Sequence, residues 1–317
     1  MKHLASIVFV CFALAASVLG ATCAIADADH IRIVMVSHAP DADSWWNVIK
    51  NTYKLAAKEM GVAVEYRNPP SGDIADMARL IEQATASNPD GILTTIADYN
   101  VLKAPIEAAV KKGIPVITFN SGTIEQSKSL GALMHIGQPE YVAGKAAGER
   151  VKAEGGKNFV CVNHAIAVLA LVDRCNGFAD GLGVPLGDNM IDAGMDPTSV
   201  KTRVEAYLKT HPDTDTILTE GPNGAEPTIQ VVKDLHLAGK VRFGTFDLSA
   251  QIVSAIKDGT IEFAIDQQPF LQGYLPVVLM TNYIRYGVIP PDSINSGPGF
   301  VTKANADVVS KLAGEYR

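Results

Sequence analysis

From Ile31 onward, short apolar runs alternate along the chain with longer stretches in which apolar residues recur every three or four positions. The short runs are typical of buried strands, and the longer stretches are typical of amphipathic helices. We expect strands at residues 31–36, 62–66, 90–96, 115–119, 132–136, 158–162, 215–219, 241–246 and 261–265. Helices are expected between most of them, for example at residues 44–60, 73–87 and 99–112. Glycines that can adopt a positive φ mark several helix ends: Gly61, Gly113 and Gly259.

Strands that alternate with helices predict an α/β protein, with parallel sheets covered by helices on both faces. The segment Val34-Met-Val-Ser-His-Ala39 is echoed 126 residues later by Val160-Cys-Val-Asn-His-Ala165. A six-residue echo can arise by chance, but it fits two lobes that are built alike. A helix expected at residues 270–286 precedes a tail rich in proline and glycine, residues 288–299. This tail predicts a crossing strand, followed by a last short helix.

The first residues have the features of an export signal. Lys2 gives a positive start, residues 4–19 are apolar, and Ala24-Ile-Ala26 forms a small-x-small cleavage site. Cys23 raises the alternative of a lipoprotein, but Thr22 stands where lipoprotein signal peptidases prefer glycine or alanine. We therefore expect cleavage after Ala26 and a periplasmic protein, with residues 1–26 removed.

Charge and cysteine content narrow the functional classes. Residues 1–26 contain one of the 27 basic residues and none of the 34 acidic ones, so the mature chain carries 26 − 34 = −8. An acidic chain without a basic run argues against nucleic acid as a partner. Export leaves Cys161 and Cys175, for which a disulfide or two buried thiols are both possible. The scattered histidines show no metal-ligand spacing, and no metal or cofactor is expected.

The two tryptophans of the chain, Trp45 and Trp46, are adjacent and follow the first expected strand. Ligands of doubly wound folds bind at the carboxyl ends of strands, so the pair lies where a ligand platform would be. The alternative is that both are core residues, although neighbouring helical residues point about 100° apart, so both cannot face squarely inward. Ser44 is the expected cap of the helix that they open.

Five further motifs follow one another along the chain: Gly113-Ile-Pro-Val-Ile-Thr-Phe-Asn120, Met134-His-Ile-Gly-Gln138, Arg174-Cys-Asn-Gly-Phe178, Phe243-Gly-Thr-Phe-Asp247 and Ile265-Asp-Gln-Gln-Pro269. In this order and spacing they resemble the ribose-binding type of periplasmic sugar-binding protein, the substrate receptor of ABC transporters. The resemblance covers essentially all of the mature chain. It implies two doubly wound lobes that are joined by a three-crossover hinge and close on a ligand in the cleft between them.

The resemblance also implies the lobe boundaries. The N-terminal lobe would contain residues 29–137 and 268–292, and the C-terminal lobe residues 138–267 and 293–317. A monomer is expected, with a small carbohydrate as ligand and the membrane permease of an ABC transporter as partner.

The family's ligand positions match residues that suit a sugar, whose C–H faces need aromatic surfaces and whose hydroxyls need hydrogen-bond partners. Structural alternatives remain open for two of them: Asp247 as a helix N-cap, and Arg174, expected near a helix start, as a surface ion pair. The expected ligand contacts are Ser37, Trp45, Trp46, Asn120, Gln138, Arg174, Met195, Gly221, Asn223, Phe246, Asp247 and Gln267.

Departures from the family pattern bear on the identity of the ligand. Gly221 offers no side chain where the family has a ligand asparagine, and Met195 stands where an aromatic is usual. The pocket is therefore expected to differ in shape from a ribose site. Glu220 and Asp266 add acidic groups that would suit an amino sugar, although a solvated face explains them equally well.

Three classes of function remain. The expected one is a solute-binding protein that delivers a monosaccharide or sugar alcohol to an ABC importer. The second is a chemotaxis or signal receptor of the same fold, for a small polyol or amino sugar. The third is an exported α/β enzyme, which we do not expect, because the chain has no Gly-x-Ser-x-Gly and no Gly-x-Gly-x-x-Gly after its first strand.

Overall fold

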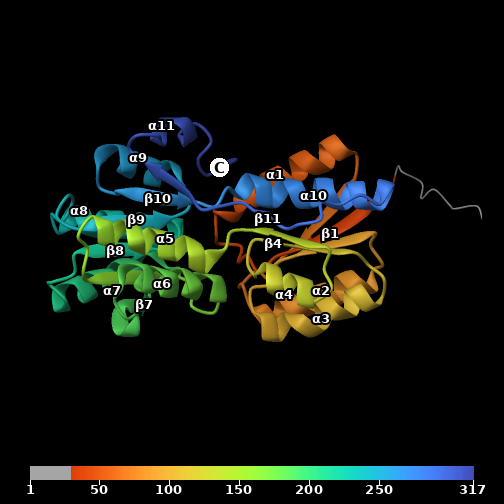
Figure 1. Cartoon of the computed structure of the whole chain (residues 1–317), viewed down its shortest axis with the longest axis horizontal. Helices are drawn as coiled ribbons and strands as arrows, with labels where there is room; N and C mark the ends of the chain where they lie inside the picture. Colours follow the sequence, from red (N-terminus) through yellow and green to blue (C-terminus); the bar gives the residue numbers. More distant parts are fainter. Residues whose placement is uncertain (1–29) are drawn as a thin grey trace, which may run out of the picture.

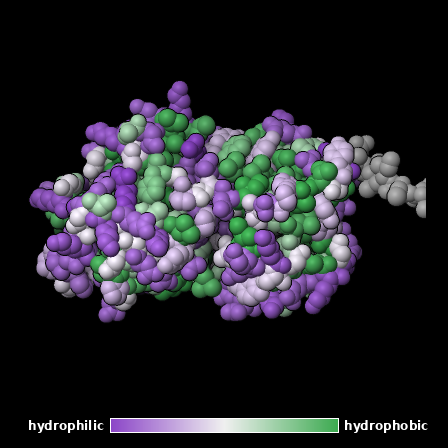
Figure 2. Space-filling model, in the orientation of Figure 1, coloured by the Kyte–Doolittle hydropathy of each residue, from purple (hydrophilic) through white to green (hydrophobic). Residues whose placement is uncertain are grey.

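The computed structural model describes residues 30–317, and the expected signal peptide and its cleavage site lie outside them. Two sheets of six strands each form two lobes that lie side by side (Figure 1). The space-filling view shows two rounded bodies that meet along a shallow groove (Figure 2). Within residues 30–317, no helix is both long and apolar enough to cross a bilayer.

The first sheet has the order β11-β5-β4-β3-β1-β2, and all its strands are parallel. Its strands are β1 (Arg32–Val36), β2 (Ala63–Arg67), β3 (Gly91–Thr94), β4 (Val116–Phe119), β5 (Met134–Gly137) and β11 (Ile294–Asn295). Its helices are α1 (Trp46–Met60), α2 (Ile74–Ala86), α3 (Tyr99–Lys111), α4 (Ile124–Ser129) and α10 (Pro269–Tyr286). Separate apolar clusters lie under α1 with α10 and under α2 with α3, one on each face of the sheet.

The second sheet repeats this plan in the order β12-β10-β9-β8-β6-β7, with only β12 antiparallel to its neighbour. Its strands are β6 (Phe159–Asn163), β7 (Met190–Asp192), β8 (Thr216–Thr219), β9 (Arg242–Phe246), β10 (Phe263–Asp266) and β12 (Gly299–Thr302). Its helices are α5 (Glu140–Ala153), α6 (Leu169–Leu182), the short 3-10 helix Gly187–Asn189, α7 (Pro197–Thr210), α8 (Pro222–Asp234), α9 (Ala250–Asp258) and α11 (Ala306–Val309). The predicted α/β class with two lobes is confirmed.

The chain passes from one sheet to the other three times: after β5, after β10, and between β11 and β12. The third crossing corrects the sequence-based boundary at residue 293. Ile294 and Asn295 pair with Ile136 and Gly137 of β5, so these two residues still belong to the first sheet. As Figure 1 shows, α10 comes late in the sequence but lies beside α1. The equally late strand β11 pairs with β5 at the edge of the first sheet.

Helices α5 and α6 pack with their backbones in direct contact through four glycines, a feature that we call the α5–α6 glycine contact: Gly144, Gly148, Gly177 and Gly181. A Cβ at Gly177 would lie 2.1 Å from the carbonyl oxygen of Tyr141, and one at Gly144 would lie 2.1 Å from that of Arg174. Real Cβ atoms do not approach oxygens this closely, so the two helices can come together only because these positions are glycine. The contact brings the start of α5 next to the middle of α6.

Two expected helix starts are wrong. Helix α1 begins at Trp46 without a side-chain cap, because Asp43 rather than Ser44 accepts a hydrogen bond there, from the backbone N–H of Trp45. Helix α6 begins at Leu169, so Arg174 lies in its second turn and not at its first residues.

Candidate functional site

A cavity of about 360 Å³ lies between the lobes, at the carboxyl ends of the strands. This volume falls within the range of roughly 300–1,000 Å³ that is usual for small-molecule sites. Most of the ligand contacts expected from the sequence line it: Trp45, Trp46, Asn120, Arg174, Met195, Gly221, Asn223, Asp247 and Gln267. Ser37, Gln138 and Phe246 do not line it.

Trp45 and Trp46 form one wall of the cavity and are both buried. Their rings meet edge to face, with centroids 5.3 Å apart. Trp45 is the N-cap residue of α1 and already has helical backbone angles, φ −56° and ψ −36°. The two side chains therefore leave the same turn in different directions, and both rings still line the cavity. The platform and core interpretations therefore both apply, since the same rings also belong to the apolar cluster under α1.

Asn120 and Asp247 occupy equivalent places. Asn120 directly follows β4 and Asp247 directly follows β9, and each of these strands is third in the spatial order of its sheet. Both have a positive φ, 58° for Asn120 and 64° for Asp247, a conformation that is uncommon for residues other than glycine. Gln267 at the second crossover joins them: its Oε1 accepts from Asn120 Nδ2 at 3.3 Å, and its Nε2 donates to Asp247 Oδ1 at 2.7 Å. The two lobes are thus linked by a buried chain of hydrogen bonds through the hinge.

Arg174 forms a buried ion pair with Glu140, which sequence reasoning missed. Nε donates to one carboxylate oxygen at 2.7 Å, and Nη2 donates to the other at 3.1 Å. On the other side, Nη1 lies 3.7 Å from Asp247 Oδ2 and donates to the backbone oxygen of Glu220 at 3.0 Å. Burial alone would lower the pKa of Arg174, but the carboxylates of Glu140 and Asp247 raise it above its usual value. The guanidinium is therefore held as a fixed cation at the cavity wall.

Gln138 and Phe246, two expected contacts that do not line the cavity, hold Arg174 in place instead. Gln138 donates from Nε2 to the Glu140 carboxylate at 2.8 Å. The ring of Phe246 lies under the guanidinium, with its centroid 4.3 Å away. Ser37 has a different role, because its hydroxyl hydrogen-bonds to Tyr66 and accepts from the N–H of Ala39. These three residues are placed near the site without reaching the cavity.

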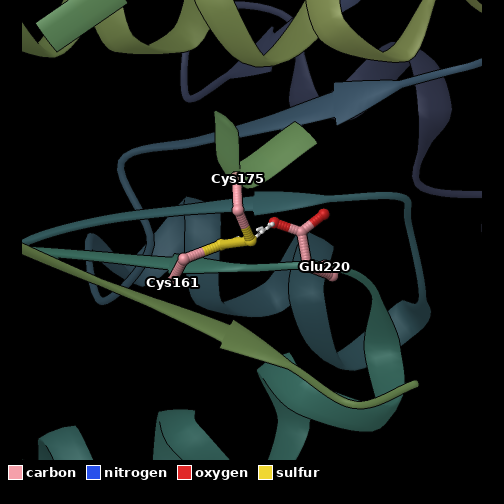
Figure 3. Close-up of side chains that lie close together, drawn as sticks. All are labelled: Cys161, Cys175 and Glu220. Carbon is pink, nitrogen blue, oxygen red and sulfur yellow. Dashed lines mark hydrogen bonds between the residues drawn. A yellow bond between two sulfur atoms is a disulfide. The ribbon is translucent and has the colours of Figure 1, made fainter. Parts of the chain in front are cut away.

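Cys161 and Cys175 are joined in a disulfide that ties α6 to β6. Glu220 Oε1 lies 2.9 Å from the sulfur of Cys161 and 3.4 Å from that of Cys175, as Figure 3 shows. Burial raises the pKa of Glu220 well above its usual range, against the opposing charge of Arg174. Disulfide sulfurs carry no hydrogen, so the carboxyl group of Glu220, once protonated, is the group that can donate here.

Among the described residues, these same three form the cluster whose ligand atoms lie close enough together for a metal ion. A metal would need the thiolate form of both cysteines. The disulfide removes it, so the cluster does not fit a metal. Asp266, the other acid considered from the sequence, bonds to Arg317 and to the N–H of Gln268 instead of lining the cavity.

The cavity is also lined by His38 and His164, the two histidines of the sequence echo. Sequence reasoning used them as evidence for duplication and not as site residues. The signal that identifies them is their place just after equivalent strands, His38 two residues after β1 and His164 directly after β6.

A model of the family described as periplasmic binding protein domain matches residues 33–287. The chain is 24% identical over 244 residues to the ribose import binding protein RbsB of Haemophilus influenzae, covering 75% of this chain and 80% of that protein. It is 24% identical over 255 residues to the xylose/arabinose-binding protein XylF of Sulfolobus acidocaldarius, covering 76% of this chain and 63% of that protein.

Among solved structures, the chain is similar to a carbohydrate transporter from Acidothermus cellulolyticus 11B in complex with myo-inositol. The TM-score is 0.83 and the sequence identity 37%, with 91% of this chain and all of that chain covered.

Proposed function

This chain belongs to the periplasmic binding protein domain family, and we propose that it binds a monosaccharide or sugar alcohol between its lobes for delivery to an ABC importer. The observation that carries the proposal is that one cavity has an aromatic wall and, opposite it, a polar wall. Trp45 and Trp46 present apolar rings on the side of the first lobe, and Arg174 and Asp247 present buried hydrogen-bonding groups on the side of the second.

Such a pair of walls suits a hydroxylated ring. The C–H faces of a sugar or cyclic polyol pack against aromatic rings, and its hydroxyls need partners, since an unmet buried polar group costs roughly 1–3 kcal/mol. The names of the similar proteins support this class of ligand, and the complex with myo-inositol supports a cyclic polyol within it. The acidic cluster around Arg174 then offers acceptors and donors for adjacent hydroxyls.

The proposal includes export by a cleaved signal peptide and a permease as the membrane partner. The family supports both, and the residues before Asp27 support the cleavage. Exported protein that begins at Asp27 would support this part, and protein that keeps residues 1–26 would contradict it.

Binding is tested by a thermal-shift screen of the mature protein, followed by calorimetry, with myo-inositol, D-ribose, D-xylose and L-arabinose. A ligand that binds only the folded state raises its stability by roughly 2.7 kcal/mol at a hundredfold excess over Kd. We expect one of these compounds to raise the melting temperature and to bind with 1:1 stoichiometry. The double variant Trp45→Ala/Trp46→Ala should lose that shift. A flat response to the whole screen would contradict the proposal.

A further inference from the structure

The two histidines of the sequence echo occupy equivalent places in the two lobes. His38 lies two residues after β1, and His164 directly follows β6. These strands hold the same position in the two sheets: β1 lies between β3 and β2, and β6 lies between β8 and β7. The echo in the sequence therefore corresponds to a repeat in space, and it brings one imidazole from each lobe to the same cavity.

Both imidazoles are buried and neutral. Their exposed fractions are 6% for His38 and 8% for His164. Burial lowers the pKa of each to about 4, and for His164 the charge of Arg174 acts in the same direction. A neutral imidazole carries one N–H donor and one acceptor nitrogen. Each ring can therefore serve a hydroxyl group as either partner.

Each ring has hydrogen-bonding capacity that the protein leaves unused. Nδ1 of His38 pairs with Thr95 Oγ1 at 2.9 Å, and the ring meets Trp46 edge to face at 5.0 Å. These contacts fix the ring and leave Nε2 for another partner. Nδ1 of His164 is buried and has no partner among the described residues. An unmet buried nitrogen is costly, and a partner from outside the chain would remove that cost.

Gly221 lies next to His164 at the cavity wall. Gly221 has φ 153° and ψ −178°, a conformation that is essentially restricted to glycine. A Cβ there would lie 3.4 Å from Cε1 of His164 and 3.5 Å from Oδ2 of Asp247. Because residue 221 has no side chain, His164 and Asp247 form this part of the wall.

We propose that His38 and His164 are ligand contacts that hydrogen-bond to hydroxyl groups of the bound polyol from opposite lobes. They thereby select a ligand with hydroxyls on two sides of its ring. This inference rests on the proposed function, because it assigns two more residues to the same cavity.

The test compares His38→Asn and His164→Asn with a matched control, His135→Asn. His135 is also buried, with an exposed fraction of 2%, and burial lowers its pKa to about 4. Its Nδ1 pairs with Thr118 Oγ1 at 2.9 Å, as that of His38 pairs with Thr95. However, His135 lines a different cavity, next to the first crossover. It therefore reproduces the cost of losing a buried histidine without touching the proposed site.

Calorimetry with myo-inositol, D-ribose, D-xylose and L-arabinose measures affinity, and thermal melting measures stability. We expect His38→Asn and His164→Asn each to weaken binding about tenfold. The affinity of His135→Asn should stay within about twofold of the wild-type affinity, even if its melting temperature falls as much as those of the other two variants. In spectra of 15N-labelled protein, ligand should shift the ring nitrogens of His38 and His164 and leave those of His135 in place.

The outcomes separate this inference from the proposed function. Wild-type binding with unchanged affinity in both cleft variants would overturn the role of the histidines and leave the proposed function standing. An equal loss in all three variants would assign the effect to stability and would also overturn it. No wild-type binding to any compound of the screen would overturn the proposed function and this inference together.

Discussion

At the residue scale, Arg174 is surrounded by more acidic groups than its single charge can balance. Glu140, Glu220 and Asp247 all lie within 4.0 Å of its guanidinium. Burial raises the pKa of Asp247 to about 7 and that of Glu220 well above its usual range. Protonation of these two groups therefore relieves the excess, and Glu140 is the main ionic partner of Arg174.

We expect Arg174→Lys to lower both stability and affinity. Lysine keeps the charge but cannot reproduce the two parallel hydrogen bonds to Glu140. The unfolding free energy should fall by roughly 1–3 kcal/mol, and binding should weaken at least tenfold, or about 1.4 kcal/mol. Denaturant unfolding and calorimetry measure the two effects.

The control for this variant is Arg203→Lys, at an exposed pair with Asp192, where we expect a change below about 1 kcal/mol. Wild-type values for both stability and affinity in Arg174→Lys would show that the two parallel hydrogen bonds to Glu140 have no role.

The pH dependence of stability should reflect the buried histidines. His38, His135 and His164 have a pKa of about 4 in the folded protein, below the value of 6.5 expected when unfolded. Between these values the unfolded state binds more protons, so stability is lost as pH falls from 6.5 to 4, by up to roughly 3 kcal/mol per histidine. The raised pKa of Asp247 acts in the opposite direction as pH falls from about 7.

Denaturant unfolding of wild type and His135→Asn at pH 7 and pH 4.5 isolates one of these groups. The variant should lose less stability between the two pH values than the wild type does. Parallel losses would show that His135 is protonated in the folded protein at pH 4.5.

Sequence reasoning could place Asn120, Asp247 and Gln267 at the site, because the family resemblance implies these positions and each directly follows a recognisable strand. It could not predict Glu140, whose role depends on how two helices pack. It also placed Ser37 in the cavity, although Tyr66 of the neighbouring strand occupies its hydroxyl. A strand end can be recognised from its own residues, whereas a partner from another element cannot.

At the element scale, every strand expected from an apolar run is present. Most of these strands are buried on both faces of a sheet, which leaves a continuous hydrophobic signal, although β2 is a partly exposed edge strand. Strand β7 gave no such signal, since it is a short, partly exposed edge strand. The starts of α1 and α6 were missed because neither helix has a side-chain cap at its N-terminus. Strand positions were therefore more predictable than helix ends.

The α5–α6 glycine contact should not tolerate a methyl group. Gly177→Ala would place Cβ 2.1 Å from a backbone oxygen of α5, and a backbone oxygen cannot move aside as a side chain can. We expect a loss of more than roughly 3 kcal/mol in unfolding free energy. Ligand affinity should also fall, because Glu140 and Arg174 are carried by these two helices.

Gly224→Ala in α8 is the control, because its Cβ would meet ordinary contacts at 3.4 Å or more. It should be neutral or stabilising by up to about 1 kcal/mol. Equal melting temperatures for the two variants would contradict the assigned role of the contact.

At the scale of the whole molecule, the described state has its lobes together. Trp46 is 3% exposed, and the N–H of Leu169 in the second lobe donates to the oxygen of Ala97 in the first. The cavity lies between two lobes that are in contact, so we expect the lobes to part when a ligand enters. Hinge closure is an established behaviour of this family, and the three crossovers provide the hinge.

Small-angle scattering should therefore show a smaller radius of gyration with saturating ligand than without it. Glycerol at the same concentration serves as the control for a change of solvent. Identical scattering with and without a ligand whose binding is shown by calorimetry would exclude closure on binding.

The repeated strand order has a consequence for how a ligand is oriented. The two lobes place equivalent residues on opposite sides of the cavity, His38 opposite His164 and Asn120 opposite Asp247. With these residues alone, a nearly symmetrical ring could bind in either of two orientations. The helices that follow β1 and β6 remove this ambiguity. One brings aromatic rings to the cavity, and the other brings a guanidinium. A ring with one apolar face and one hydroxyl-rich edge is therefore expected to have a single favoured pose, which is set by the difference between two otherwise equal halves.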